Sequence, residues 1–127
     1  MRSANVLLGL SSALLVGTGA AYVLVPGAML GIVDIEATST SVFLLRTEGV
    51  ALVCAGIFVL SAIGRPDRAV LIVLVGLAAY YVFSSVIDLM AWTDGVVGDI
   101  SLPSVFVRLV LGVVCALSAL RLRATAT

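Results

Sequence analysis

Long apolar runs alternate with short polar segments along the chain. Residues 3–33 and 69–87 contain no charged residue, and residues 49–64 and 109–120 form two shorter uncharged runs. A helix needs about 20 mostly apolar residues to cross a hydrocarbon core of roughly 30 Å. The pattern therefore predicts four membrane-spanning helices, over residues of about 4–25, 42–63, 69–92 and 105–122.

The segments between these spans contain charged residues, Pro, Gly, Ser or Thr, which interrupt membrane helices. They cover residues 34–41, 64–68 and 93–104. Pro26 is predicted to end the first span, and residues 27–33 then form a short interfacial piece. The first span is long for a signal peptide, so we expect it to remain as an anchor.

Composition narrows the fold class further. Hydrophobic residues make up 62 % of the chain and charged residues 11 %, whereas a soluble domain is nearer half apolar and a quarter charged. No span has a polar face wide enough for a soluble four-helix bundle, and continuous apolar runs exclude a β-barrel. We expect an all-α, integral membrane four-helix bundle that forms a single domain over residues 1–127.

The arginines predict the orientation of this bundle. With four spans, all the arginines that lie outside the spans fall on one side of the membrane. The charged residues in the loops on the opposite side are all acidic. The arginines of the first side are Arg2, Arg65, Arg68, Arg121 and Arg123. By the positive-inside rule, both termini are cytoplasmic and the protein lies in the cell (inner) membrane, as a multi-pass protein with membrane lipid as its surroundings.

Small residues recur at every fourth position of the first span, at Gly9, Ala13, Gly17 and Ala21. Such a stripe lets another helix backbone approach closely. The second span has a comparable face, with Glu48, Ala51, Ala55 and Ala62. Its other face is suited to lipid and carries Val50, Val53, Ile57 and Leu60. These patterns predict helix association, within the chain, between copies or with another membrane protein.

Four ionisable residues lie inside the predicted spans: Arg46, Glu48, Asp88 and Arg108. A charge at the bilayer centre costs about 2.5–3.5 kcal/mol on insertion scales, and less near the interface. All four are expected at similar depth in the outer part of the bilayer. Arg46 and Glu48 point in nearly opposite directions, so we expect Arg46 to extend outward to head groups.

The other three charges are expected to face one polar pocket. Glu48 shares a face with small residues, and Arg108 lies on a small, polar face of the last span. We predict that these two residues form a pair, with Asp88 as a competing partner for Arg108. Tyr81 and Ser84 share the face of Asp88 and are expected beneath it. Structural pairing and ligand binding both remain open for this pocket.

Residue types that support common chemistries are missing. The chain has no histidine, and its two cysteines, Cys54 and Cys115, form no Cys-x-x-Cys motif. No phosphate-binding glycine loop is present. Seven Lys and Arg balance seven Asp and Glu, which removes the electrostatic basis for a nucleic-acid partner. The sequence predicts no catalytic residue, metal site or cofactor, and it does not favour an enzyme.

The segment 45–52, which contains Arg46 and Gly49 in an Arg-x-x-Gly arrangement and is followed by Gly56, resembles the corresponding helix of small DoxX-like bacterial membrane proteins. The position of Pro26 at the end of the first span also resembles these proteins. The resemblance covers mainly the first two spans. It implies four membrane helices and, for a few relatives, association with quinone-linked oxidoreductases.

Three functions fit these observations. The first is a protein without catalytic machinery that acts by helix association, as a homo-oligomer or as an accessory subunit of another membrane protein. The second is a lipid or small-molecule binder, or a transporter, that uses the pocket of Glu48, Asp88 and Arg108. The third, implied by the resemblance, is a subunit of a quinone-linked membrane oxidoreductase.

Overall fold

A computed structural model describes residues 2–65, 67–99 and 102–125 of the chain. These residues form five helices: α1 (Arg2–Leu24), α2 (Pro26–Ile32), α3 (Ser39–Ser61), α4 (Asp67–Thr93) and α5 (Leu102–Thr125). Four of them are long and apolar enough to cross a membrane, over Ser3–Leu24, Ser39–Ser61, Arg68–Thr93 and Leu102–Ala124. The predicted all-α class, four helices of membrane-crossing length and a short helix beginning at Pro26 are confirmed.

Local sequence explains where the helices begin and end. The side chains and backbone amides of Thr38 and Ser41 form a reciprocal capping box, which starts α3 three residues before the predicted span. Pro26 opens α2, where its missing N–H costs little. Gly64 and Gly95 follow α3 and α4 with φ angles of 75° and 71°, a conformation that favours glycine.

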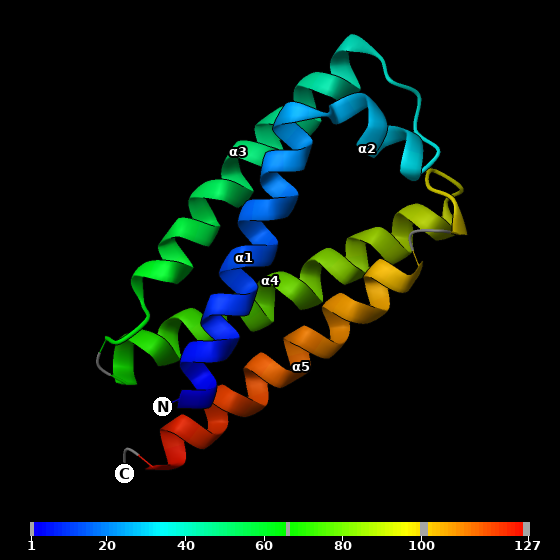
Figure 1. Cartoon of the computed structure of the whole chain (residues 1–127). Coiled ribbons are helices and arrows are strands. Elements are labelled where there is room, and N and C mark those ends of the chain that lie inside the picture. The colour runs from blue at the N-terminus through cyan, green and yellow to red at the C-terminus, as the bar shows by residue number, and fades with distance from the viewer. Residues whose placement is uncertain (1, 66, 100–101, 126–127) are drawn as a thin grey trace.

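The long helices form two antiparallel hairpins, α1 with α3 and α4 with α5 (Figure 1). Both termini and the turn between α3 and α4 lie at one end of the molecule, which we call the terminal end. The opposite end, called the α2 end, holds α2 and the loop between α4 and α5. Figure 1 shows the hairpins diverging toward the α2 end, with α2 extending across from the first hairpin toward the second.

Glycines bring α1 and α3 into backbone contact. A Cβ atom on Gly19 would lie 2.5 Å from the carbonyl oxygen of Gly49, and one on Gly49 would lie 2.7 Å from that of Gly19. Near the middle of both helices, the buried Ser12 hydroxyl donates a 2.8 Å hydrogen bond to the Gly56 carbonyl. The first hairpin therefore packs where side chains are missing, as is common between membrane helices.

The interface does not use the small-residue stripe that the sequence indicates for α1. Ala13 and Gly17 are exposed, and nothing lies within 4 Å of a Cβ added to Gly17. The face that meets α3 instead carries Ser12 and Gly19. The middle of the stripe therefore lies on the outside of the hairpin, whereas Gly9 is half-buried near Ile63, and helix association through the stripe stays a prediction.

The predicted faces of α3 are partly wrong. Its buried positions are Gly49, Leu52, Gly56 and Val59, one residue away from the predicted small face. Of that predicted face, Glu48, Ala51 and Ala55 are exposed and Ala62 is buried. The predicted lipid face is confirmed at Val50, Ile57 and Leu60, which are exposed. Val53 instead approaches Gly19.

The second hairpin is joined differently. A Cβ on Gly112 of α5 would meet Val82 and Tyr81 of α4 at 3.1 and 3.4 Å, so the helices approach closely but leave some room. The buried Ser85 hydroxyl hydrogen-bonds the Tyr81 carbonyl of its own helix at 2.7 Å and the Val105 carbonyl of α5 at 3.3 Å.

The two hairpins share an apolar core that is concentrated toward the terminal end. Leu8, Leu74 and Cys115, from three different helices, are fully buried there. On α4 the buried positions run from Val70 to Ser85, and none of the residues from Val86 to Thr93 is buried. The half of the molecule near the α2 end is therefore packed less completely between the hairpins.

Hydrogen bonds connect the loops at the α2 end. The Trp92 indole donates to the Asp99 carboxylate at 2.8 Å, which ties the end of α4 to the following loop. The Gly98 amide donates to the Val33 carbonyl at 3.3 Å, which links this loop to the segment after α2. Asp34, beside this link, has a positive φ of 60° and contacts Gly98. The two hairpins thus meet again at their far end.

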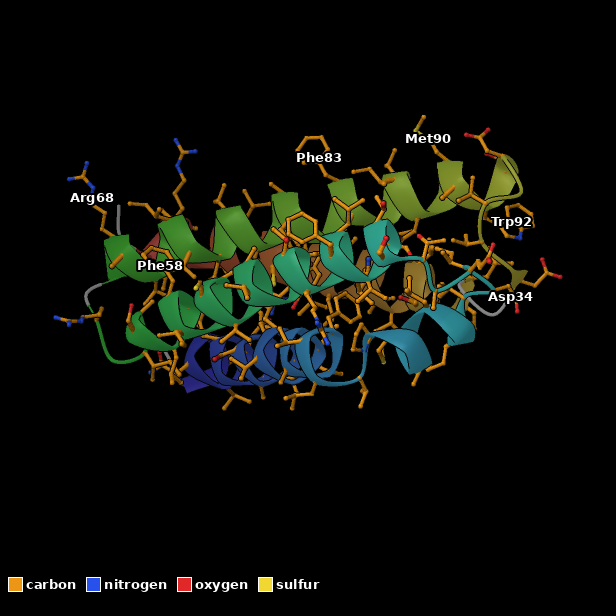
Figure 2. All side chains as sticks on the ribbon, turned by 90° about the horizontal axis from the view of Figure 1, so that it is seen from above. Asp34, Phe58, Arg68, Phe83, Met90 and Trp92 are labelled. Carbon is orange, nitrogen blue, oxygen red and sulfur yellow. The ribbon has the colours of Figure 1, made fainter. Side chains whose placement is uncertain are left out.

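Large apolar side chains cover the outside of the molecule. Phe83 and Met90 point away from the helices in Figure 2, and their exposed fractions are 68 % and 59 %. Phe58, which lies beside α3 and α4, is 65 % exposed. Arg68 lies at the terminal end, whereas Trp92 and Asp34 lie at the α2 end. This distribution of exposed apolar surface between two polar ends is typical of membrane-spanning helices.

Candidate functional site

An ion pair joins α4 and α5 within the less completely packed half. Arg108 Nη1 lies 2.6 Å from Asp88 Oδ2, a distance typical of a charge-assisted hydrogen bond. The exposed fractions of the two side chains are 26 % and 33 %. Arg108 therefore pairs with Asp88, which we predicted only as a competing partner. The two residues meet because both belong to the same hairpin.

Glu48 lies near this pair but does not join it. Its carboxylate, on α3 of the other hairpin, is within electrostatic range of both Arg108 and Asp88. Among the described residues it has no hydrogen bond or salt bridge, and its side chain is exposed. The predicted Glu48–Arg108 pair is therefore absent. Arg46, two residues earlier, is exposed, as expected from its opposite direction.

Two tyrosines that the sequence analysis did not select complete the site. Tyr22 on α1 and Tyr80 on α4 both lie within electrostatic range of Arg108 and Glu48. All four long helices therefore contribute to one group of side chains. We call this group the polar cluster; it consists of Tyr22, Glu48, Tyr80, Asp88 and Arg108.

Local packing explains how these tyrosines reach the site. A Cβ on Gly49 would lie 2.9 Å from Tyr22 Cβ, so the glycine contact seats Tyr22 against α3, beside Glu48. Tyr80, Ser84 and Asp88 are spaced four residues apart on α4, and helical residues with this spacing share a face. That spacing could have identified Tyr80 from the sequence. No comparable signal distinguishes Tyr22.

Tyr81 and Ser84, the two remaining predicted residues, are engaged elsewhere. Tyr81 is 4 % exposed, and its hydroxyl is buried beside Ser11 and Cys115, with Arg108 as a weaker neighbour. Ser11 Oγ and the Tyr81 hydroxyl have no partner of good hydrogen-bond geometry among the described residues. The Ser84 hydroxyl donates to the Tyr81 carbonyl at 3.2 Å, within its own helix.

An apolar pocket of about 300 Å³ that is open to the outside lies between the two hairpins and meets the polar cluster at Tyr80. We call it the inter-hairpin cavity. Side chains of α1, α3 and α4 line it: Leu15, Ala55, Phe58, Val59, Ile72, Val73, Gly76, Leu77 and Tyr80. Tyr80 belongs to both the cavity wall and the polar cluster. Polar groups therefore stand at one side of an apolar space, an arrangement typical of small-molecule sites.

The chemistry of these side chains suits binding. Within the described part of the chain, no group of three or more His, Cys, Asp or Glu residues could hold a metal ion. Cys54 and Cys115 are both free thiols, one exposed and the other buried. The polar cluster offers a guanidinium, two phenols and an unpaired carboxylate, which can hydrogen-bond to a polar head group.

Comparisons with known proteins place no constraint on this site. No family model matches the chain, and neither a curated protein nor a solved structure was found to match it.

Proposed function

We propose that this chain is a multi-pass membrane protein that binds a small amphiphile between its two hairpins. The observation that carries the proposal is the polar cluster, to which all four long helices contribute, beside the inter-hairpin cavity. The polar head of the ligand contacts the cluster, and its apolar part enters the cavity past Tyr80. Membrane helices commonly place such sites between them.

The charges support this proposal unequally. Asp88 and Arg108 satisfy each other, so helix pairing alone accounts for both. Glu48 has no such partner among the described residues, although an ionisable residue within a span is costly. A head group that donates a hydrogen bond, such as a hydroxyl or an amine, would satisfy its carboxylate. Glu48 is therefore the recognition residue in this proposal.

Mass spectrometry of the purified protein tests the proposal. We expect wild-type protein, solubilised in mild detergent, to retain a small molecule that Glu48→Gln loses. Arg46→Gln is the matched control, because Arg46 is an exposed charge on the same helix that points away from the cluster. Retention by all three proteins, or by none, would contradict the proposal. A quinone among the retained molecules would favour the oxidoreductase subunit.

Helix association is a second candidate function, because the middle of the small-residue stripe of α1 is exposed. Ala13 and Gly17 leave open space that a second helix could fill. The mass of the solubilised complex under native conditions tests this function. A homo-oligomer predicts a whole multiple of the chain mass, reduced to a single chain by Gly17→Ile, whereas a fixed partner of different mass indicates an accessory subunit.

We further propose an orientation in the cell (inner) membrane with both termini in the cytoplasm. Support comes from the arginines outside the spans, which belong to the terminal end, whereas the loops of the α2 end carry Asp34, Glu36, Asp94 and Asp99. Single cysteines at Ser39 and Asp67, in a background with Cys54→Ala and Cys115→Ala, should react with an impermeant reagent from opposite sides. Reaction from one side would contradict this topology.

A further inference from the structure

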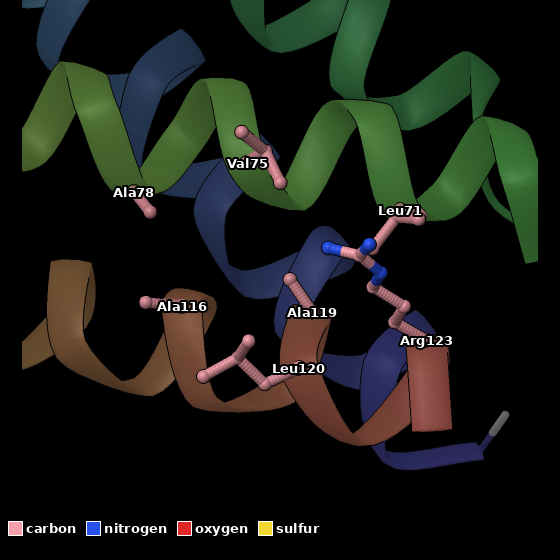
Figure 3. A pocket seen from close by; sticks show the side chains of 7 residues that line it. All are labelled: Leu71, Val75, Ala78, Ala116, Ala119, Leu120 and Arg123. Atoms are coloured by element: carbon pink, nitrogen blue, oxygen red, sulfur yellow. The ribbon is translucent and has the colours of Figure 1, made fainter. Parts of the chain in front are cut away.

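A second apolar space lies on the α5 side of α4, at the same level as the inter-hairpin cavity and on the terminal-end side of the polar cluster. It is a groove of about 390 Å³ between α4 and α5, which we call the α4–α5 groove. Figure 3 shows its walls, formed by Leu71, Val75 and Ala78 of α4 and by Ala116, Ala119 and Arg123 of α5. Its volume is in the range of small-molecule sites, and the three alanines leave the space between the helices open.

Arg123 is the charged residue among the groove-lining side chains. It stands in the last turn of α5, at the terminal end, and its side chain extends from α5 toward Leu71 in Figure 3. Among the residues whose side chains the structure describes, no carboxylate forms a salt bridge with Arg123. A positive charge without an acidic partner among the described side chains therefore lies where an apolar groove reaches the end of a membrane-length helix.

We propose that the α4–α5 groove binds an anionic glycerophospholipid. Its phosphate contacts the Arg123 guanidinium, which matches phosphate oxygens with paired N–H donors. One acyl chain lies in the groove between Val75 and Ala116, about 10 Å along the helix axis from Arg123 at 1.5 Å per residue. Charge and apolar lining thus match the two parts of one lipid molecule.

The surroundings of the groove favour an anionic head group over a zwitterionic one. Arg65 and Arg68 are exposed at the same end of the molecule, so the local field is positive. Basic pockets between membrane helices at such an end attract anionic lipid head groups. This site is separate from the polar cluster and does not depend on the function proposed for Glu48.

Native mass spectrometry with defined lipids tests the head-group contact. Delipidated protein is titrated with phosphatidylglycerol or phosphatidylcholine of identical chains. We expect wild-type protein to bind phosphatidylglycerol about tenfold more tightly, and Arg123→Gln to lose this preference. Arg65→Gln removes the same charge at the same end without lining the groove, and it should keep most of the preference.

A second pair of variants tests the acyl-chain contact. Val75→Trp fills the groove from an exposed position of α4, and we expect about tenfold weaker binding of phosphatidylglycerol. Leu117→Trp places the same bulk on α5 at an exposed position that does not line the groove, and it should bind like wild type. Melting curves of all four variants confirm that each is folded.

Four results would overturn this proposal. Equal binding of the two lipids by wild-type protein removes the anionic preference. If Arg123→Gln and Arg65→Gln lose the preference for phosphatidylglycerol equally, the preference comes from the overall positive charge of the terminal end. Displacement of phosphatidylglycerol by free glycerol phosphate, or undiminished binding by Val75→Trp, shows that a phosphate site exists without a bound chain.

Discussion

The two hairpins are held together by opposite means. In the α1–α3 hairpin, Gly19 and Gly49 place backbone against backbone, with no space for a Cβ atom. In the α4–α5 hairpin, Gly112 leaves more room, and an ion pair between Asp88 and Arg108 joins the helices. The first contact is therefore sensitive to atoms that are added, and the second to charges that are removed.

This difference also assigns separate roles to the hairpins at the candidate site. The glycine contact of the first hairpin seats Tyr22 beside Glu48 and leaves the Glu48 carboxylate without a partner among the described residues. The second hairpin neutralises its own charges internally. A ligand at the polar cluster would therefore find an unsatisfied group on one side and a preformed ion pair on the other.

The largest effect is expected from Gly49→Ala. The added methyl would lie 2.7 Å from the Gly19 carbonyl oxygen, which cannot move without separating the helices. We expect roughly 3 kcal/mol of destabilisation, because overpacking against backbone allows little relaxation. Titration with a denaturing detergent measures the free energy of unfolding. Gly17→Ala is the matched control and should be neutral or stabilising, since its Cβ meets nothing. Equal losses in both would contradict the backbone contact.

A double-mutant cycle on Asp88 and Arg108 examines the other hairpin. Arg108→Leu leaves the Asp88 carboxylate unpaired, and we expect about 2 kcal/mol of destabilisation. This is less than for a fully buried pair because water and head groups can reach the orphaned charge. Combining it with Asp88→Asn should recover part of the loss in the same unfolding titration. Strictly additive losses would show that the pair does not stabilise the hairpin.

The hydrogen bonds of two serines allow a comparison of the two hairpins with smaller expected changes in stability. Ser12→Ala removes a buried 2.8 Å hydrogen bond between α1 and α3, and we expect a loss of about 0.6–1 kcal/mol. Ser85→Ala should cost less, since its bond to α5 is longer, at 3.3 Å, and its shorter bond stays within α4. A larger loss for Ser85→Ala would reverse this order, and the unfolding titration is again the measurement.

The smallest coupling is expected between the hairpins, at Glu48 and Arg108. They lie within electrostatic range but form no salt bridge, so their coupling energy should be below about 0.5 kcal/mol. Glu48→Gln alone should leave the free energy of unfolding nearly unchanged. A coupling as large as that of Asp88 with Arg108 would mean that Arg108 changes partner in the membrane.

The spans could be predicted from the sequence because charged residues are rare and most of them lie outside the apolar runs. The faces could not, because α1 and α3 are apolar all round and carry no amphipathic signal. Small residues then offer competing stripes. On α1, Gly17 and Gly19 belong to different faces, and the interface uses Gly19 because Gly49 lies opposite it. That match is a property of two helices together, which a single helix pattern does not contain.

The candidate site could likewise be predicted only in part from the sequence. Glu48, Asp88 and Arg108 stand out as charges within spans, and the structure brings them near one another. Their pairing could not be predicted, since it depends on which helices form a hairpin. Tyr80 and Tyr81 are adjacent on α4, and only the position of the core decides which one is buried.

The uneven core has a consequence for hydrogen exchange. Backbone amides exchange when a segment opens locally, and segments with few buried contacts open most easily. On α4, the amides up to Ser85 belong to the packed half, whereas those from Val86 onward are supported mainly by their own helix. Exchange should therefore be slow in the first part of α4 and much faster in the last two turns. Asp88 lies in the faster segment, so the polar cluster can rearrange around a ligand without unfolding the core.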